Sequence, residues 1–79
     1  MVRQIAGAHL VKVRELALQD VVVGTAASGA FVDGPRQLVK QEDAPEHARR
    51  EDAHRLWWAD GTSQVLYGGT LVFVKDRRG

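Results

Sequence analysis

The amino-acid sequence predicts an all-β fold, a small barrel or open roll of five to six short antiparallel strands. Short apolar segments recur at regular spacing and are separated by turn residues, as in small β-domains. The pairs Asp33-Gly34, Asp60-Gly61 and Gly68-Gly69 are strong turn signals, because glycine accepts the positive φ that tight turns require. The run Val21–Val23 favours extended chain, since valine is stiff at χ1. We treat residues 1–79 as a single small β domain with a thin core.

The segment His54–Lys75 is interpreted as a three-stranded antiparallel meander that ends the domain. If Asp60-Gly61 form a two-residue turn, Trp58 lies opposite Ser63, and directly opposed residues share a face. A second turn centred on Gly68-Gly69 extends both faces into the third strand. The predicted core face carries His54, Leu56, Trp58, Val65, Tyr67, Val72 and Val74. The other face mixes apolar and basic side chains and carries Arg55, Trp57, Gln64, Leu66, Leu71, Phe73 and Lys75.

The start of the chain has two interpretations. Residues 1–8 form an arm or an irregular first strand, and the alternation over Leu10–Arg14 favours a strand after it. A helix over residues 2–18 is the competing interpretation, because Ile5, His9, Val13 and Leu16 fall near one helical face. Gly7 disfavours that helix, so a strand is our expectation.

The segment Leu16–Val23 is expected to form a compact turn that leads into a strand. It reads Leu-Ala-Leu-Gln-Asp-Val-Val-Val and resembles the entry of many small β-barrels, in which a leucine precedes Gly-Asp and valines. SH3-like and KOW-like modules and the opening of Hint-type domains share this pattern, with Gln19 here in place of the usual glycine. The resemblance implies an SH3-like barrel architecture and no functional residues. Splicing chemistry is not implied, because the Cys or Ser at the chain start and the His motif of Hint domains are absent.

The middle of the chain alternates short strands and turns. Thr25–Gly29 is a loop of small residues that lacks the Lys-Ser/Thr of a phosphate loop. Residues 30–32 and 37–40 are expected to be strands on either side of Asp33-Gly34-Pro35. Residues 41–52 form a polar loop, mobile or folded into a single exposed helical turn, and the tail 76–79 is expected to be frayed.

Composition excludes several classes of protein. The net charge of +1 shows none of the basic excess of a dedicated nucleic-acid domain, and the absence of cysteine excludes disulfides and thiolate zinc sites. No apolar run spans a bilayer and no secretory signal is evident, so we expect a cytoplasmic protein. Eight arginines against three lysines, with many alanines and valines, are typical of GC-rich genomes such as those of actinobacteria and their phages.

No residue pattern predicts catalysis, so we expect that the protein is not an enzyme and uses no cofactor. His47, Glu51 and His54 have helical spacing, and a continuous helix would make them a metal site. We expect instead a solvated loop and no metal, because His54 belongs to the following strand. Ser28 and Ser63 have no recognisable nucleophile context.

The expected function is that of a non-enzymatic binding or regulatory module that acts through the mixed face around Trp57. Its predicted binding surface comprises Trp57, Leu66, Leu71, Phe73, Arg55 and Lys75. Whether Trp57 is exposed or covered is open from sequence. The alternative is nucleic-acid binding, with Trp57 stacking on bases and Arg14, Arg36 and Arg55 contacting phosphates. Partners therefore include another protein or a second copy of the chain in a homodimer, and nucleic acid with weaker support.

Overall fold

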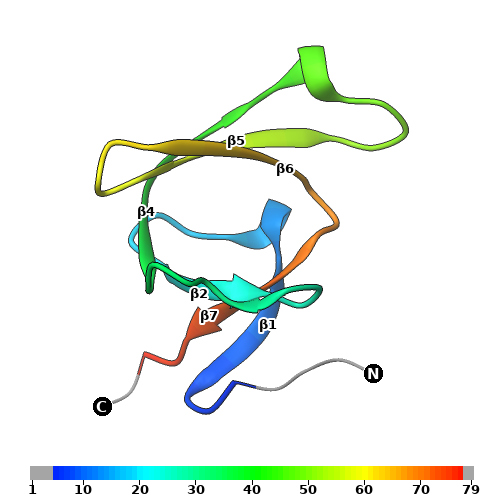
Figure 1. Ribbon diagram of the computed structural model, residues 1–79. Helices are drawn as coiled ribbons and strands as arrows, with labels where there is room; N and C mark the ends of the chain where they lie inside the picture. Colours follow the sequence, from blue (N-terminus) through cyan, green and yellow to red (C-terminus); the bar gives the residue numbers. More distant parts are fainter. Residues whose placement is uncertain (1–4, 78–79) are drawn as a thin grey trace.

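Seven antiparallel strands form one open sheet in the computed structural model, which describes residues 5–77 (Figure 1). The order across the sheet is β1-β7-β2-β4-β5-β6, and the short β3 pairs with β2. The strands are β1 (Ala8–Lys12), β2 (Val21–Thr25), β3 (Gly29–Ala30), β4 (Arg36–Asp43), β5 (Ala53–Trp58), β6 (Ser63–Tyr67) and β7 (Leu71–Lys75). Two 3-10 turns, η1 (Val13–Glu15) and η2 (Pro45–His47), are the helical elements of the described chain. The all-β class is confirmed, with seven strands instead of five to six and without closure of the sheet.

Strand β4 divides the sheet into two facing layers. Its first residues, Arg36 and Gln37, pair with β2, whereas Leu38 and the residues after it pair with β5. The register shifts by one residue between Leu38 and Lys40, so β4 has a bulge there. A bulge bends its strand and increases the local twist. Figure 1 shows the result: β4 rises from a lower layer of β1, β7 and β2 to an upper layer of β5 and β6.

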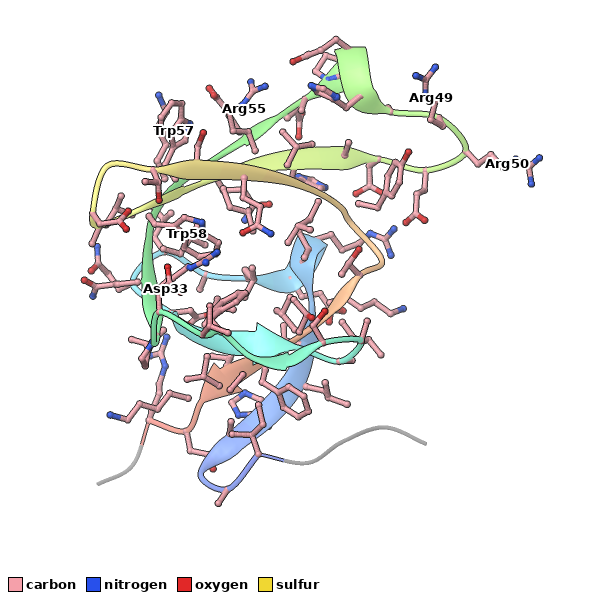
Figure 2. The ribbon with its side chains drawn as sticks, viewed as in Figure 1. Asp33, Arg49, Arg50, Arg55, Trp57 and Trp58 are labelled. Atoms are coloured by element: carbon pink, nitrogen blue, oxygen red, sulfur yellow. The ribbon has the colours of Figure 1, made fainter. Side chains whose placement is uncertain are left out.

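The hydrophobic core fills the space between these layers. Trp58 points into this space in Figure 2, and its side chain is almost fully buried. The core cluster comprises Val13, Leu16, Val22, Leu38, Leu56, Trp58, Val72 and Val74. Four of the residues predicted for the core face, Leu56, Trp58, Val72 and Val74, are therefore confirmed. The other three, His54, Val65 and Tyr67, are not in the cluster.

The predicted three-stranded meander is wrong at its last step. β5 and β6 form a hairpin, but β7 does not pair with β6. After Gly68–Thr70 the chain crosses to the lower layer, where β7 lies between β1 and β2. β7 pairs with β1 from Ala8↔Lys75 to Lys12↔Leu71, so the first strand is also the neighbour of the last.

The turn between β5 and β6 has three residues, not the predicted two. Trp58 N–H donates to Thr62 C=O at 2.8 Å, and Gly61 has a φ of +91°. This is the geometry of a three-residue loop that ends in a left-handed residue. Asp60 Oδ1 also accepts from the backbone N–H of Thr62 at 2.9 Å. Trp57 therefore lies opposite Ser63, a shift of one residue from the prediction, and such a shift reverses the faces of β6.

The expectations for the other segments have mixed outcomes. The strand at the chain start is confirmed by β1, and the helix over residues 2–18 is excluded for its described part. The single helical turn of the polar loop is η2, although β4 runs on to Asp43. The strand over residues 30–32 is wrong, because β3 ends at Ala30 and Val32 is fully exposed.

The compact turn before β2 is present and is built around a left-handed residue. Gln19 has a φ of +78° and is the one non-glycine residue with positive φ in the described chain. Asp20 Oδ2 accepts from the N–H of Ala17 at 2.9 Å. The turn is joined to β4, since Gln19 N–H donates to Leu38 C=O at 2.7 Å and Leu38 N–H donates to Asp20 C=O at 2.9 Å.

Candidate binding surface

The six residues predicted to form one binding surface lie in three different environments. Trp57 and Arg55 point away from the core, on the outer side of the upper layer (Figure 2). Leu66 instead packs against the core cluster, because the shifted register turns it inward. Leu71, Phe73 and Lys75 lie on β7 in the other layer. Phe73 is only 3% exposed, on a strand that has a neighbour on each side. The predicted surface is therefore split, and only its Trp57–Arg55 part stays together.

Trp57 and Arg55 belong to a face that β4, β5 and β6 build together. The strand register aligns Lys40 with Trp57 and Ser63, and it aligns Glu42 with Arg55 and Val65. Ala53 and Tyr67 form the next row. We define the outer face as Lys40, Glu42, Arg55, Trp57, Val65 and Tyr67. The sequence-based reasoning missed Val65 and Tyr67 because it placed them in the core. If the turn at Ala59–Gly61 is counted as three residues, the register places Val65 and Tyr67 on the outer face.

The centre of the outer face is an aromatic ring among paired charges. Trp57 is half-buried, and its indole Nε1–H donates to Glu42 Oε1 at 3.0 Å. Arg55 Nη2 lies 3.4 Å from Glu46 Oε2, and Lys40 Nζ lies 3.9 Å from Glu42 Oε2. Hydrogen bonding to backbone N–H holds the pKa of Glu46 below its ordinary value, and the positive charge of Arg55 adds to this effect. These contacts fix Trp57 and Arg55 in place but leave the ring of Trp57 partly open to solvent.

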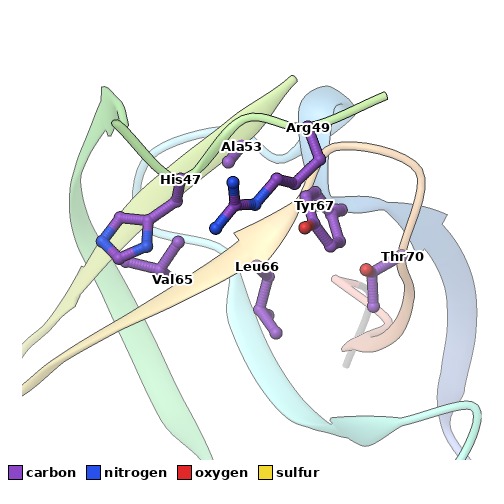
Figure 3. Close-up of a pocket in the computed structure, with 7 residues that line it drawn as sticks. All are labelled: His47, Arg49, Ala53, Val65, Leu66, Tyr67 and Thr70. Carbon is purple, nitrogen blue, oxygen red and sulfur yellow. The ribbon is translucent and has the colours of Figure 1, made fainter. Parts of the chain in front are cut away.

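A hollow of about 320 Å³ lies at the end of the outer face, where the segment that carries η2 packs against β5 (Figure 3). The apolar groups are Ala53, Val65, Leu66 and the ring of Tyr67, which is 40% exposed. The polar groups are His47, Arg49 and Thr70. A smaller hollow of about 230 Å³ is lined by Arg49, Arg50, Glu51 and Tyr67. Tyr67 and Arg49 therefore line both hollows.

A network of charged side chains joins η1 to the loop before β5. Arg14 Nη2 lies 2.8 Å from Asp52 Oδ1, and His54 Nε2 lies 2.5 Å from Asp52 Oδ2. The hydrogen bond from Arg14, followed by that with His54, holds the pKa of Asp52 well below its ordinary value. His54 Nδ1 lies 3.6 Å from Asp43 Oδ1, so both ring nitrogens face carboxylates. We interpret the network as structural, because it ties η1 to the loop before β5.

The arginines of the nucleic-acid alternative do not form one basic surface. Arg14 pairs with Asp52, and Arg55 pairs with Glu46. Arg36 Nη2 lies 3.1 Å from Asp33 Oδ1, and its guanidinium stacks on the ring of Phe31 at 3.9 Å from the centroid. Each of the three therefore has a carboxylate at contact distance, which reduces the positive potential available to a phosphate backbone.

The candidate metal ligands are also held apart. His47 lies 3.9 Å from Glu46, Glu51 pairs with Arg14, and His54 pairs with Asp52. Within residues 5–77 no group of three His, Cys, Asp or Glu side chains is placed so that it could hold a metal ion. No helix in that range is long and apolar enough to cross a membrane.

Side-chain contacts join the last described residues to β1 and to the turn before β2. Asp76 Oδ1 lies 2.6 Å from His9 Nδ1, and Arg77 Nη2 lies 3.3 Å from Asp20 Oδ1. The last two residues of the tail that was expected to be frayed, 78–79, lie outside the described part. No family model, curated protein or solved structure matches this chain.

Proposed function

We propose that the protein is a non-enzymatic binding module that acts through the outer face around Trp57. The observation that carries the proposal is the chemistry of this face. Two aromatic rings, Trp57 and Tyr67, are partly exposed there together with Val65 and Arg55. Trp, Tyr and Arg are the residues most enriched at the energetic centres of protein interfaces. A sheet face that served only as a solvent boundary would be mostly polar.

The proposal favours a protein partner over a nucleic acid. Glu42 and Glu46 lie among the basic side chains of the outer face, and they would repel phosphates. The support for the nucleic-acid alternative is Trp57, whose ring has Lys40 as its cross-strand neighbour, an arrangement suited to base stacking. The proposed location is the cytoplasm, and the proposed module needs neither metal nor cofactor.

Selection of ligands from a displayed random-peptide library would test the proposal. Peptides enriched on the wild-type protein should lose at least about tenfold in affinity on Trp57→Ala, since anchor side chains of an interface contribute more than about 1 kcal/mol. The matched control is Leu71→Ser on the lower layer, which should leave affinity unchanged. Thermal unfolding by circular dichroism would show that both variants are folded. Peptides that bind the two variants equally well would refute the assignment of the surface.

A salt titration distinguishes the protein-binding proposal from the nucleic-acid alternative. The anisotropy of a labelled single-stranded oligonucleotide would be measured while salt is raised from about 50 to about 200 mM. Binding that falls steeply with salt and requires Trp57 would favour nucleic acid. Peptide binding that changes little over the same range would favour an apolar protein contact.

A further inference from the structure

The edge of the sheet at β6 has backbone groups without partners. β6 is the last strand in the sheet order and pairs only with β5. Trp58 N–H donates to Thr62 C=O, and Gly68 N–H donates to Asp52 C=O, each at 2.8 Å. Hydrogen-bonded pairs alternate along an antiparallel ladder, so residues 62, 64, 66 and 68 face β5. Ser63, Val65 and Tyr67 therefore turn their N–H and C=O groups outward.

One of these outward groups is already used. Tyr67 C=O accepts from the N–H of Thr70 at 3.0 Å. Ser63 and Val65 retain both their N–H and C=O, and Tyr67 retains its N–H. A free edge of this kind is a template for another extended segment. No proline or charged residue on β6 (Ser-Gln-Val-Leu-Tyr) protects the edge from such pairing.

The hollow of about 320 Å³ lies directly beside this edge. Val65, Leu66 and Tyr67 contribute to both the edge and the hollow (Figure 3). A strand added along β6 would alternate its side chains between the two faces of the sheet. The side chains on the outer side would then lie over Val65 and Tyr67, next to apolar surface.

Two arginines add positive charge in this region: Arg49 lines the hollow, and the adjacent Arg50 lines the smaller hollow beside Tyr67. Arg49 and Arg50 form no ion pair with a residue of the described chain. The acidic neighbours in the same loop are engaged elsewhere: Glu46 with Arg55, and Glu51 with Arg14 and the N–H of Gly69. A partner that lies in the hollow would gain most from carboxylates near Arg49 and Arg50.

We propose that β6 binds an extended acidic peptide segment of a partner protein as an additional strand. This inference rests on the proposed function and names its partner class. The peptide residue opposite Val65 exchanges two backbone hydrogen bonds with it. An apolar side chain of the peptide fills the hollow, and carboxylates of the peptide pair with Arg49 and Arg50. A second copy of the chain fits less well, because β6 itself carries no acidic residue to offer Arg49.

The probe is a fluorescein-labelled peptide that contains Glu-Thr-Val-Thr-Glu, so that the valine and both glutamates lie on the same face of the added strand, and binding is measured by anisotropy. The matched control peptide has lysine in place of glutamate and should not bind. Val65→Pro removes one outward N–H without breaking the hairpin, since that N–H does not face β5. Val65→Pro and the double variant Arg49→Glu/Arg50→Glu should each weaken binding at least about tenfold. Amide shifts of Ser63, Val65 and Tyr67 in a ¹⁵N spectrum should change on binding.

The outcomes that overturn the proposal are distinct. Binding that survives Val65→Pro but is lost in the double arginine variant would show attraction by charge alone. A concentration-dependent dimer in sedimentation that Val65→Pro abolishes would assign the edge to a second copy. An acidic peptide that fails to bind would refute the proposed partner class. In that case library peptides that still require Trp57 would leave the proposed function intact, whereas their absence would refute both.

Discussion

Gln19 offers a direct test of the backbone geometry in the turn before β2. Its φ of +78° lies in the left-handed region, where a Cβ approaches the following carbonyl oxygen. At an ordinary position alanine is more stable than glycine by about 0.5–1 kcal/mol, because glycine loses more entropy on folding. At this position the order should reverse, so Gln19→Gly should be more stable than Gln19→Ala.

The magnitude follows from two opposing terms. The left-handed conformation costs a residue with a Cβ about 1–2 kcal/mol, and glycine avoids this cost. Alanine loses less conformational entropy on folding than glycine, which stabilises Gln19→Ala by about 0.5–1 kcal/mol relative to Gln19→Gly. Gln19 Oε1 accepts from Gln37 Nε2 at 2.9 Å, but both variants lose this contact and it cancels. The net advantage of Gln19→Gly over Gln19→Ala therefore lies between about 0 and 1.5 kcal/mol, with a central value of about 0.75 kcal/mol.

Urea unfolding followed by tryptophan fluorescence, to which the buried Trp58 contributes, would measure the difference. The matched control is Ala17→Gly in the same turn, where φ is not positive and glycine should destabilise by about 0.5–1 kcal/mol. In a domain of this size 1 kcal/mol corresponds to about 4–8 °C in Tm, so both effects are measurable. If Gln19→Ala is the more stable variant at this position, the assigned backbone geometry is wrong.

Two further predictions concern packing and pH. A Cβ added at Gly24 would lie 2.1 Å from the carbonyl oxygen of Gly29, so Gly24→Ala should destabilise by at least about 2 kcal/mol in urea unfolding. A Cβ added at Gly61 would have no atom within 4 Å, and only the φ of +91° opposes it, so Gly61→Ala should destabilise the protein less than Gly24→Ala. An equal loss of stability in the two variants would contradict the clash at Gly24. Asp52 has a depressed pKa through Arg14, so its contribution to stability is present above its unfolded pKa of about 3.9 and is lost as pH falls through the folded pKa. Asp52→Asn should therefore lower Tm at pH 7 and differ less from wild type toward pH 3; a gap that is constant with pH would rule this out.

The class of the fold was predictable because its signals are local. Three valines in β2 and the alternation in β1 favour extended chain whatever their neighbours are. The turn at Gln19 was also recognisable from the leucine and aspartate around it, although nothing local shows that glutamine takes the left-handed position. Leu56 and Trp58 were placed correctly in the core because their alternation along β5 does not depend on the partner strand.

The register of the hairpin was not predictable from the same signals. Asp60-Gly61 suits a two-residue turn, and it suits equally a three-residue turn with Gly61 as its last residue. Hydrophobicity does not decide between them, because Val65 and Leu66 are adjacent and both apolar. A shift of one residue moves Leu66 to the core side and turns Val65 and Tyr67, a third of the outer face, outward.

The position of β7 depended on contacts that are remote in the sequence. Gly68-Gly69 reads as a hairpin turn, yet Val13 N–H donates to Thr70 C=O and Arg14 N–H donates to Gly68 C=O. These bonds guide the chain toward the lower layer, where β1 and β2 occupy both sides of β7. Leu71 and Phe73 could not be separated from Trp57 without knowledge of this crossing.

The bend in β4 has a consequence for how such a chain can vary. The β5–β6 hairpin shares strand pairing with the lower layer only through β4, and the two layers otherwise meet through core side chains and loop contacts. Two loops border this hairpin: Ala59–Gly61 joins β5 to β6, and the segment around η2 joins β4 to β5. Their length and composition can therefore change over evolution with little effect on the pairing of β1, β7 and β2. The bend in β4 thus separates the pairing that holds the lower layer together from the loops that border the outer face.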